Sequence, residues 1–138
     1  MYLFDTDVLS SVIRRSPDPG LIARLAAVPA DRQFTSSITV GELVYGAHRS
    51  GRHDNFLNLL EQRLWPNIRI LAFDRTAAEL YGKTRADLER AGTPLAEPDL
   101  RIACIAVTRE LTLVTGNVRY FARVPALAIE NWIGGAVR

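Results

Sequence analysis

The sequence predicts an α/β fold with three layers, in which a central, mainly parallel sheet is flanked by helices. Two observations predict this class. Short apolar runs of strand length alternate with segments of helical period along the chain, and such alternation gives parallel strands joined by helices that cover both faces of the sheet. The 138 residues also contain no repeat, low-complexity tract or linker long enough to divide them, so we expect one domain over residues 1–138.

The first half of the chain contains three expected strands and four expected helices. Residues 1–5 form an apolar run that ends in an acid, and residues 34–38 form a second apolar run. A third strand follows the helix breaker Pro66. We expect strands at 1–5, 34–38 and 68–73, and helices at 7–15, 19–27, 39–49 and 54–64.

The second half continues the alternation. Asp74 suits the cap of a long helix, whose mainly apolar positions follow the 3.6-residue period until Gly92 stops it. After a loop with Pro94, a second helix precedes two strands that are separated by a short helical turn. We expect helices at 75–91 and 98–110, strands at 111–115 and 127–130, and the helical turn at 118–122.

Residue usage indicates a reducing compartment and no membrane span. Cys104 lies in the apolar segment 101–107, where we expect a buried inert thiol, and a lone thiol forms no internal disulfide. No apolar run approaches the roughly 20 residues that span a bilayer. Asp5 and Asp7 stand where a signal peptide needs basic and then apolar residues. We therefore expect a cytoplasmic protein without membrane contact.

The net charge of +2 does not by itself identify a nucleic-acid binder, because clustering of basic residues matters more than their sum. Of the seventeen basic residues only Lys83 is a lysine. Arginine suits forked contacts with phosphate, although genomic base composition explains the bias equally well. The arginines therefore permit RNA binding without proving it.

Three carboxylates, Asp5, Glu42 and Asp99, each fall just after a short apolar run or in the first turn of an expected helix. The carboxyl ends of parallel strands face one crevice, so these acids can converge there. Converged carboxylates bind hard cations such as Mg²⁺ or Mn²⁺, because oxygen ligands match these ions and the negative charges repel without one. Asp99 has the strongest case, because it begins the buried stripe of its helix. The pattern indicates metal-assisted chemistry on a phosphate.

Each acid also has a purely structural alternative as a helix cap. Asp5 or Asp7 can cap the helix after the first strand; one suffices, and we expect Asp5 in the site and Asp7 mainly at the cap. Glu42 stands three residues after Thr39, which is the capping-box arrangement. An acid such as Asp99 is favourable in any first helical turn.

The junction after the strand at 111–115 places polar groups near the expected crevice. Gly116 permits a tight turn, and Thr115 and Asn117 suit the binding of a metal-bound water or a phosphate oxygen, or equally a simple turn. Arg101 and Arg119 lie two residues beyond Asp99 and Asn117 respectively. They either contact a nucleic-acid backbone or remain solvated.

Five segments in this order resemble the PIN-domain ribonucleases, specifically the VapC-type toxins, over nearly the whole chain. The segments are LFDTDVL at 3–9, TVGEL at 39–43, GTPL at 92–95 with DLRIA at 99–103, LVTGN at 113–117 running on to Phe121, and the closing stretch 128–132. Two departures stand out. The family usually has Asn where this chain has Asp7. Many PIN nucleases also have a fourth acid near Asn117, so we expect one tightly held cation here and not two.

The resemblance implies a Rossmann-like PIN fold and an endoribonuclease that depends on Mg²⁺, with Mn²⁺ as a substitute. It also implies a homodimer that a cognate VapB-type antitoxin inhibits. The hypothesis is that Asp5 and Asp99 hold the cation while Glu42 shares it or orients the attacking water. The expected catalytic residues are Asp5, Glu42, Asp99 and Asn117, the first three as metal ligands, and the expected substrate-binding residues are Thr6, Thr115, Arg101 and Arg119.

Two rival functions remain. A haloacid-dehalogenase-like phosphatase would explain Asp5 and Asp7 after the first strand, but Lys83 lies in mid-helix and the segment after Thr115 lacks the acids that this class requires. A PIN-like module that binds RNA or antitoxin but cleaves weakly is the non-enzymatic rival, and Asn117 is its best support. Binding of Mn²⁺ separates a nuclease from such a module.

Overall fold

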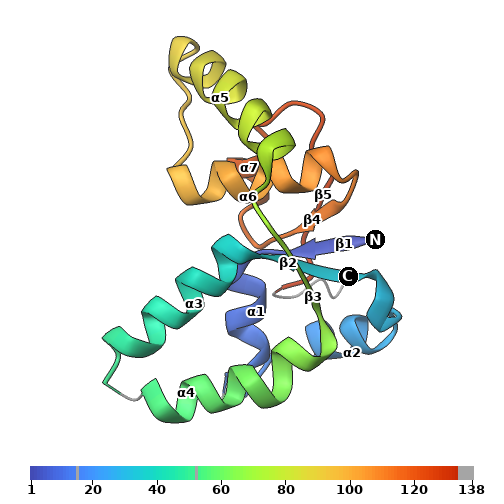
Figure 1. Cartoon of the computed structure of the whole chain (residues 1–138). Helices are drawn as coiled ribbons and strands as arrows, with labels where there is room; N and C mark the ends of the chain where they lie inside the picture. Colours follow the sequence, from blue (N-terminus) through green and yellow to red (C-terminus); the bar gives the residue numbers. More distant parts are fainter. Residues whose placement is uncertain (15, 52, 134–138) are drawn as a thin grey trace.

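A parallel sheet of five strands forms the centre of the molecule, in a computed structural model that describes residues 1–14, 16–51 and 53–133 (Figure 1). The strand order is β3-β2-β1-β4-β5, and every neighbouring pair is parallel. The chain therefore begins in the middle of the sheet and builds outward first on one side and then on the other. The strands are β1 (Tyr2–Phe4), β2 (Gln33–Ser36), β3 (Arg69–Leu71), β4 (Thr112–Val114) and β5 (Ile129–Glu130).

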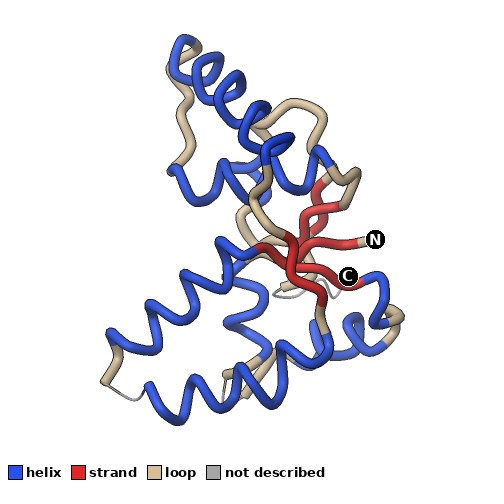
Figure 2. The backbone as a smooth tube through the Cα atoms, in the orientation of Figure 1, coloured by secondary structure: helices blue, strands red, loops and turns tan. Residues whose placement is uncertain are grey.

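Helices cover both faces of this sheet (Figure 2). One face carries α1 (Thr6–Val12), α2 (Pro19–Ala26), α3 (Ser37–Arg49) and α4 (His53–Leu59), and the other carries α5 (Arg75–Arg90), α6 (Glu97–Thr108) and α7 (Val118–Phe121). Shorter turns occur at Ala30–Arg32 and Trp65–Asn67, both of 3-10 type, and at Leu60–Leu64, of π type. The three-layer α/β prediction is confirmed.

The alternation of side chains along each strand divides the interior into two cores. Leu3 and Leu113 face the core beneath α5 and α6, whereas Phe4 and Val114 face the core beneath α1 and α3. All four side chains are completely buried. This two-residue period is the expected pattern for strands buried on both faces. Truncating Phe4 to Ala would cost about 3–5 kcal/mol of stability by this reasoning.

Helix boundaries differ from the sequence prediction where caps decide them. The third helix begins at Ser37, because the side chain of Ser36 caps it and accepts from the backbone N–H of Thr39 at 3.0 Å. The helix expected at 54–64 ends as α-helix at Leu59 and continues as the π-type turn, ahead of Pro66. The first helix ends at Val12, short of the expected 15, and residue 15 lies outside the described residues.

Cys104 is unpaired and buried within α6, as expected, and burial raises the pKa of its thiol to about 11. Within the described ranges, no helix is both long and apolar enough to cross a bilayer. The expected one-domain span includes residues 134–138, which lie outside the described residues.

Candidate active site

Asp5 sits at the point where the strand order reverses, directly after the central strand β1. Its backbone N–H donates to the carbonyl of Val114 at 3.0 Å and so continues the pairing with β4. Its Oδ1 accepts from the N–H of Thr6 at 2.8 Å, which makes Asp5 the N-cap of α1. Its Oδ2 accepts from the hydroxyl of Thr115 at 2.9 Å. Asp5 therefore serves both as the helix cap and as a crevice residue.

The Asp5 carboxyl is only 6% exposed, and its pKa is raised to about 7. Burial is the largest cause, and the negative charge of Asp7 adds to it, while the hydrogen bonds from Thr6 and Thr115 oppose it. Asp99 raises this pKa further. A buried carboxyl under this repulsion favours either a proton or a nearby cation.

Glu42 lies in the first half of α3 and faces the same crevice. Its capping-box alternative is wrong, because Ser36 and not Thr39 caps α3. Instead, the Oε1 of Glu42 accepts from the hydroxyl of Thr6 at 2.6 Å. The same hydroxyl lies 3.2 Å from that of Thr39, so Thr6 fastens the start of α1 to α3.

Asp99 lies in the first turn of α6 and is partly buried. Burial raises the pKa of its carboxyl, and the charges of Glu42 and Asp7 raise it further. The hydroxyl of Tyr120 acts in the opposite direction as a hydrogen-bond partner. Within the described ranges no side chain caps α6, whose N-cap is Ala96, so the partly buried position of Asp99 is not a capping contact.

A cavity of about 580 Å³ joins these groups and is named here the acidic cavity. It brings together three expected acids from three different elements: α3, α6 and the end of β1. Its lining includes Asp5, Thr6, Asp7, Arg14, Glu42, Asp99 and Asn117.

Asp7 and Arg14 are charged lining residues that the sequence reasoning did not assign to the site. The Oδ2 of Asp7 accepts from the backbone N–H of Gly116 at 3.0 Å, so this carboxylate crosses from α1 to the turn after β4 and does not cap its own helix. A Cβ on Gly116 would lie 2.9 Å from the same oxygen, which explains why this position holds glycine. The sequence did contain a signal for Asp7: two acids, Asp5 and Asp7, stand where the helix needs only one cap.

Of the expected substrate-binding residues, only Thr6 lines the acidic cavity. Thr115 is fully buried and its hydroxyl serves Asp5 and the N–H of Asn117, at 2.9 and 3.1 Å. Arg101 pairs with Glu97 and lines a neighbouring cavity instead. Arg119 is exposed on α7 and makes no ion pair with another described residue.

The donor set suits a hard divalent cation in its chemistry, because it consists of carboxylate oxygens under mutual repulsion. Each hydrogen-bonded carboxylate oxygen keeps a second lone-pair site for a ligand. Among the described residues, however, no three His, Cys, Asp or Glu side chains stand close enough to form a ready-made metal site. A cation held by three of these carboxylates would therefore require them to approach one another.

A parallel sheet with acids gathered at its switch point defines the class of this chain, and sequence comparison agrees. Residues 2–127 match the model of the PIN domain, so the chain belongs to the PIN-domain family. Within that family it belongs with the VapC ribonucleases. It is 35% identical to the tRNA(fMet)-specific endonuclease VapC of Salmonella typhimurium, over 95% of this chain and 97% of that protein, and 36% identical to ribonuclease VapC2 of Haemophilus influenzae, over 96% and 98%.

Solved structures lead to the same family. The DNA-bound VapBC of Salmonella typhimurium contains a chain that superposes with a TM-score of 0.88 at 35% identity, covering 96% of this chain and 98% of that one. The VapBC2 of Rickettsia felis, bound to a promoter DNA fragment, gives 0.86 at 31% identity with the same coverage. The resemblance seen in the sequence motifs is confirmed.

Proposed function

We propose that the chain is an endoribonuclease that depends on Mg²⁺, with Mn²⁺ as a substitute, and that it hydrolyses RNA phosphodiester bonds as the toxin of a type II toxin-antitoxin pair. One observation carries the proposal. Asp5, Asp7, Glu42 and Asp99 come from four different elements and line one cavity, and burial and mutual repulsion raise the pKa of Asp5 and Asp99. The names of the VapC relatives support the reaction class.

Asp5, Asp99 and Glu42 would hold the cation. A Mg²⁺ held there would supply an activated water and would neutralise charge that develops on the scissile phosphate. Thr115 favours the ionised form of Asp5 and orients it through its hydrogen bond. Glu42, held by Thr6, orients the attacking water, and the amide of Asn117 positions a phosphate oxygen at the mouth of the cavity.

Arg14 is the basic lining residue of the acidic cavity, and we assign it the contact with the RNA backbone that the sequence suggested for Arg101. Arg119 remains a candidate for a second phosphate contact outside the cavity. Arginine suits both because its planar fork matches phosphate oxygens.

A VapB-type antitoxin is the proposed protein partner. The VapBC complexes of Salmonella typhimurium and Rickettsia felis, whose toxin chains superpose on nearly all of this one, support that partner. We also propose a homodimer, which sedimentation of the purified chain tests, and a cytoplasmic location, with which the unpaired Cys104 agrees.

The first experiment incubates the purified, antitoxin-free protein with total cellular RNA, with Mg²⁺ or Mn²⁺ or with a chelator, and maps new RNA ends. An Asp99→Asn variant, which keeps the size of the side chain and removes its charge, is the control. Discrete cuts that need the metal and are absent from the variant support the nuclease and reveal its substrate.

A catalytically weak PIN-like module that binds RNA or antitoxin is the second candidate. The lack of a ready-made cluster of three metal ligands among the described residues favours it. Calorimetric titration with Mn²⁺ separates the two, because a binding module has no need for a cation at Asp5 and Asp99. A folded protein that neither cuts RNA nor binds Mn²⁺ would decide for the module.

A further inference from the structure

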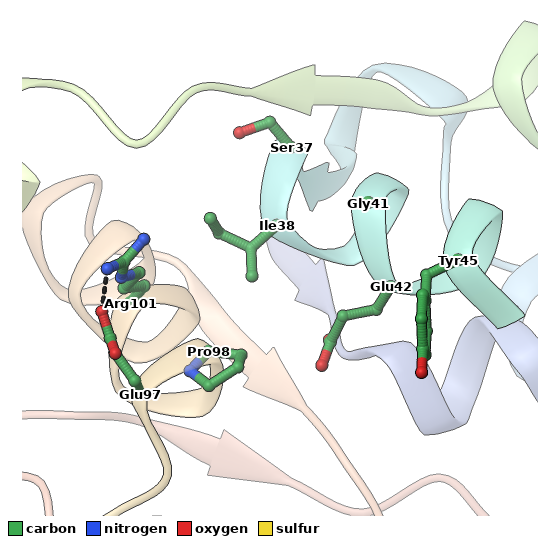
Figure 3. Close-up of a pocket in the computed structure, with 8 residues that line it drawn as sticks. All are labelled: Ser37, Ile38, Gly41, Glu42, Tyr45, Glu97, Pro98 and Arg101. Carbon is green, nitrogen blue, oxygen red and sulfur yellow. Dashed lines mark hydrogen bonds and ion pairs between the residues drawn. The ribbon is translucent and has the colours of Figure 1, made fainter.

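A second cavity, of about 480 Å³, adjoins the acidic cavity and shares Glu42 with it. It lies between α3 and the beginning of α6 (Figure 3). Ile38 and Pro98 give it apolar walls, and Gly41 adds no side chain to the wall that α3 forms. This volume is within the range of ordinary small-ligand sites, which combine apolar walls with a few polar groups.

Tyr45 lines this cavity one helical turn after Glu42 and is 64% exposed. In Figure 3 the side chains of Glu42 and Tyr45 extend from α3 in the same direction. The Tyr45 ring makes no contact with another aromatic ring of the described residues. An exposed aromatic face beside a site for phosphate chemistry is the feature on which proteins stack unpaired bases.

Arg101 and Glu97 supply the polar groups on the α6 side. Their side chains form an ion pair, and the Arg101 guanidinium lies 5.4 Å from each of the Phe73 and Tyr81 ring centroids. Both side chains are partly exposed and line the cavity, so the guanidinium offers donors beside the carboxylate acceptor. This pairing matches the edge of a base, which presents acceptors and donors in one plane.

We propose that this cavity, the base subsite, receives one unpaired nucleobase of the RNA, stacked on Tyr45 next to the scissile phosphate. The inference rests on the proposed function, because the phosphate lies over the acids and Glu42 is the wall shared by both cavities. Two carboxylates against one guanidinium, Glu42 and Glu97 against Arg101, favour a neutral base over a second phosphate. A base that stacks on a protein ring is not paired, so the substrate region is single-stranded.

Binding is tested with hexaribonucleotides that carry 2-aminopurine at each position in turn, added with Mg²⁺ to the Asp99→Asn protein. We expect quenched fluorescence at one position. Tyr45→Ala in the same protein abolishes the quenching and weakens binding roughly 5- to 100-fold, the range for loss of one stacked base. Tyr45→Phe keeps both, and Ile22→Ala, at an exposed position on α2, changes neither.

Filling the cavity tests the same proposal without removing Tyr45. No atom lies within 4 Å of a Cβ built on Gly41, so a larger side chain there enters free space. Gly41→Leu is expected to block the base and raise KM while kcat changes little, whereas Gly41→Ala leaves room and retains KM. Matching circular dichroism spectra of the two variants show that both fold.

The outcomes separate the base subsite from the nuclease itself. If the wild type cuts RNA but Tyr45→Ala and Gly41→Leu bind and cut as it does, the base subsite is wrong and the nuclease stands. If quenching depends on Tyr45 but no RNA is cut, the subsite stands and the nuclease fails. Variants that lose only antitoxin inhibition, or that only dissociate a dimer, would make the cavity a protein contact and overturn the proposal.

Discussion

The hydroxyl of Thr115 donates to the Oδ2 of Asp5 at 2.9 Å, across 110 positions of sequence. The sheet explains this proximity. β1 and β4 pair in parallel with Phe4 opposite Val114, so the residues that follow them are neighbours. The hydroxyl of a fully buried threonine is therefore directed at the most buried acid of the site.

Thr115→Val keeps the shape of the side chain and removes this hydrogen bond. Because the bond lowers the pKa of Asp5, the variant is expected to raise that pKa above about 7 and to weaken Mn²⁺ binding by about 1 kcal/mol near neutral pH. Calorimetric titrations at pH 6.5 and 8.5 check this, with Thr108→Val, whose hydroxyl bonds only to its own helix, as the control. Equal losses at both pH values would contradict the role in ionisation.

Asp5 makes the metal-free protein less stable as pH rises. Its pKa is about 7 in the folded protein, against 3.8 for an ordinary aspartate such as that of the unfolded chain, so between these values the folded state binds more protons than the unfolded state. The free energy of unfolding therefore falls by up to about 1.4 kcal/mol per pH unit in that window. Urea unfolding at several pH values measures this slope, which Asp5→Asn is expected to flatten.

Mg²⁺ is expected to reverse the same effect. An ion bound at the carboxylates stabilises only the folded state, so added Mg²⁺ raises the unfolding temperature of the wild type at pH 8. Asp5→Asn is expected to lose most of this gain. A wild type that is equally stable with Mg²⁺ and with chelator would contradict the proposed metal ligands.

Gly116→Ala is expected to destabilise the turn after β4 by about 1–2 kcal/mol, because the new Cβ would lie 2.9 Å from Asp7 Oδ2 and 3.3 Å from Ile133 Cδ1. Asp7→Ala removes the first of these atoms. The double variant is expected to lose less stability than the two single variants lose together. The coupling in a double-mutant cycle is expected to be about 0.5 kcal/mol or more. Strict additivity would show that Asp7 does not constrain Gly116.

Ser36→Ala is expected to cost about 1 kcal/mol, because Ser36 caps α3 and accepts from the N–H of Thr39. Ser37→Ala, one residue later and exposed, is the matched control and is expected to cost much less. Chemical unfolding of both variants measures the difference. A cost for Ser37→Ala that equals or exceeds the cost for Ser36→Ala would contradict Ser36 as the cap.

The periodicity of the sequence was sufficient for the layers and for most elements, because burial on a strand or helix repeats every two or 3.6 residues whatever the neighbours are. It misplaced the start of α3. Ser36 and Thr39 are both good capping residues, and the choice between them depends on where β2 ends, at Ser36, which pairing with β3 decides.

Within the acidic cavity, the sequence indicated Asp5, Glu42 and Asp99 because each follows an apolar run or opens a helix. The prediction that Asp7 mainly caps its helix was wrong, and the sequence did not single out Arg14. The positions of both side chains depend on elements that are distant in the sequence. Asp7 meets Gly116 only because β1 and β4 lie side by side. Arg101 contacts Glu97 and two aromatic rings and does not line the acidic cavity. The packing of α6 on α5 likewise sets this direction.

The sequence by itself thus determined the family, the order of the elements and the type of chemistry, because these depend on residue types and their local spacing. Only the tertiary structure decided which acid caps α1, which hydroxyl serves Asp5 and which cavity Tyr45 lines. The physical reason is that hydrogen bonds and electrostatic repulsion depend on distances of a few ångströms between residues far apart in the chain. Strand order and register fix those distances, and neither can be read from a local pattern.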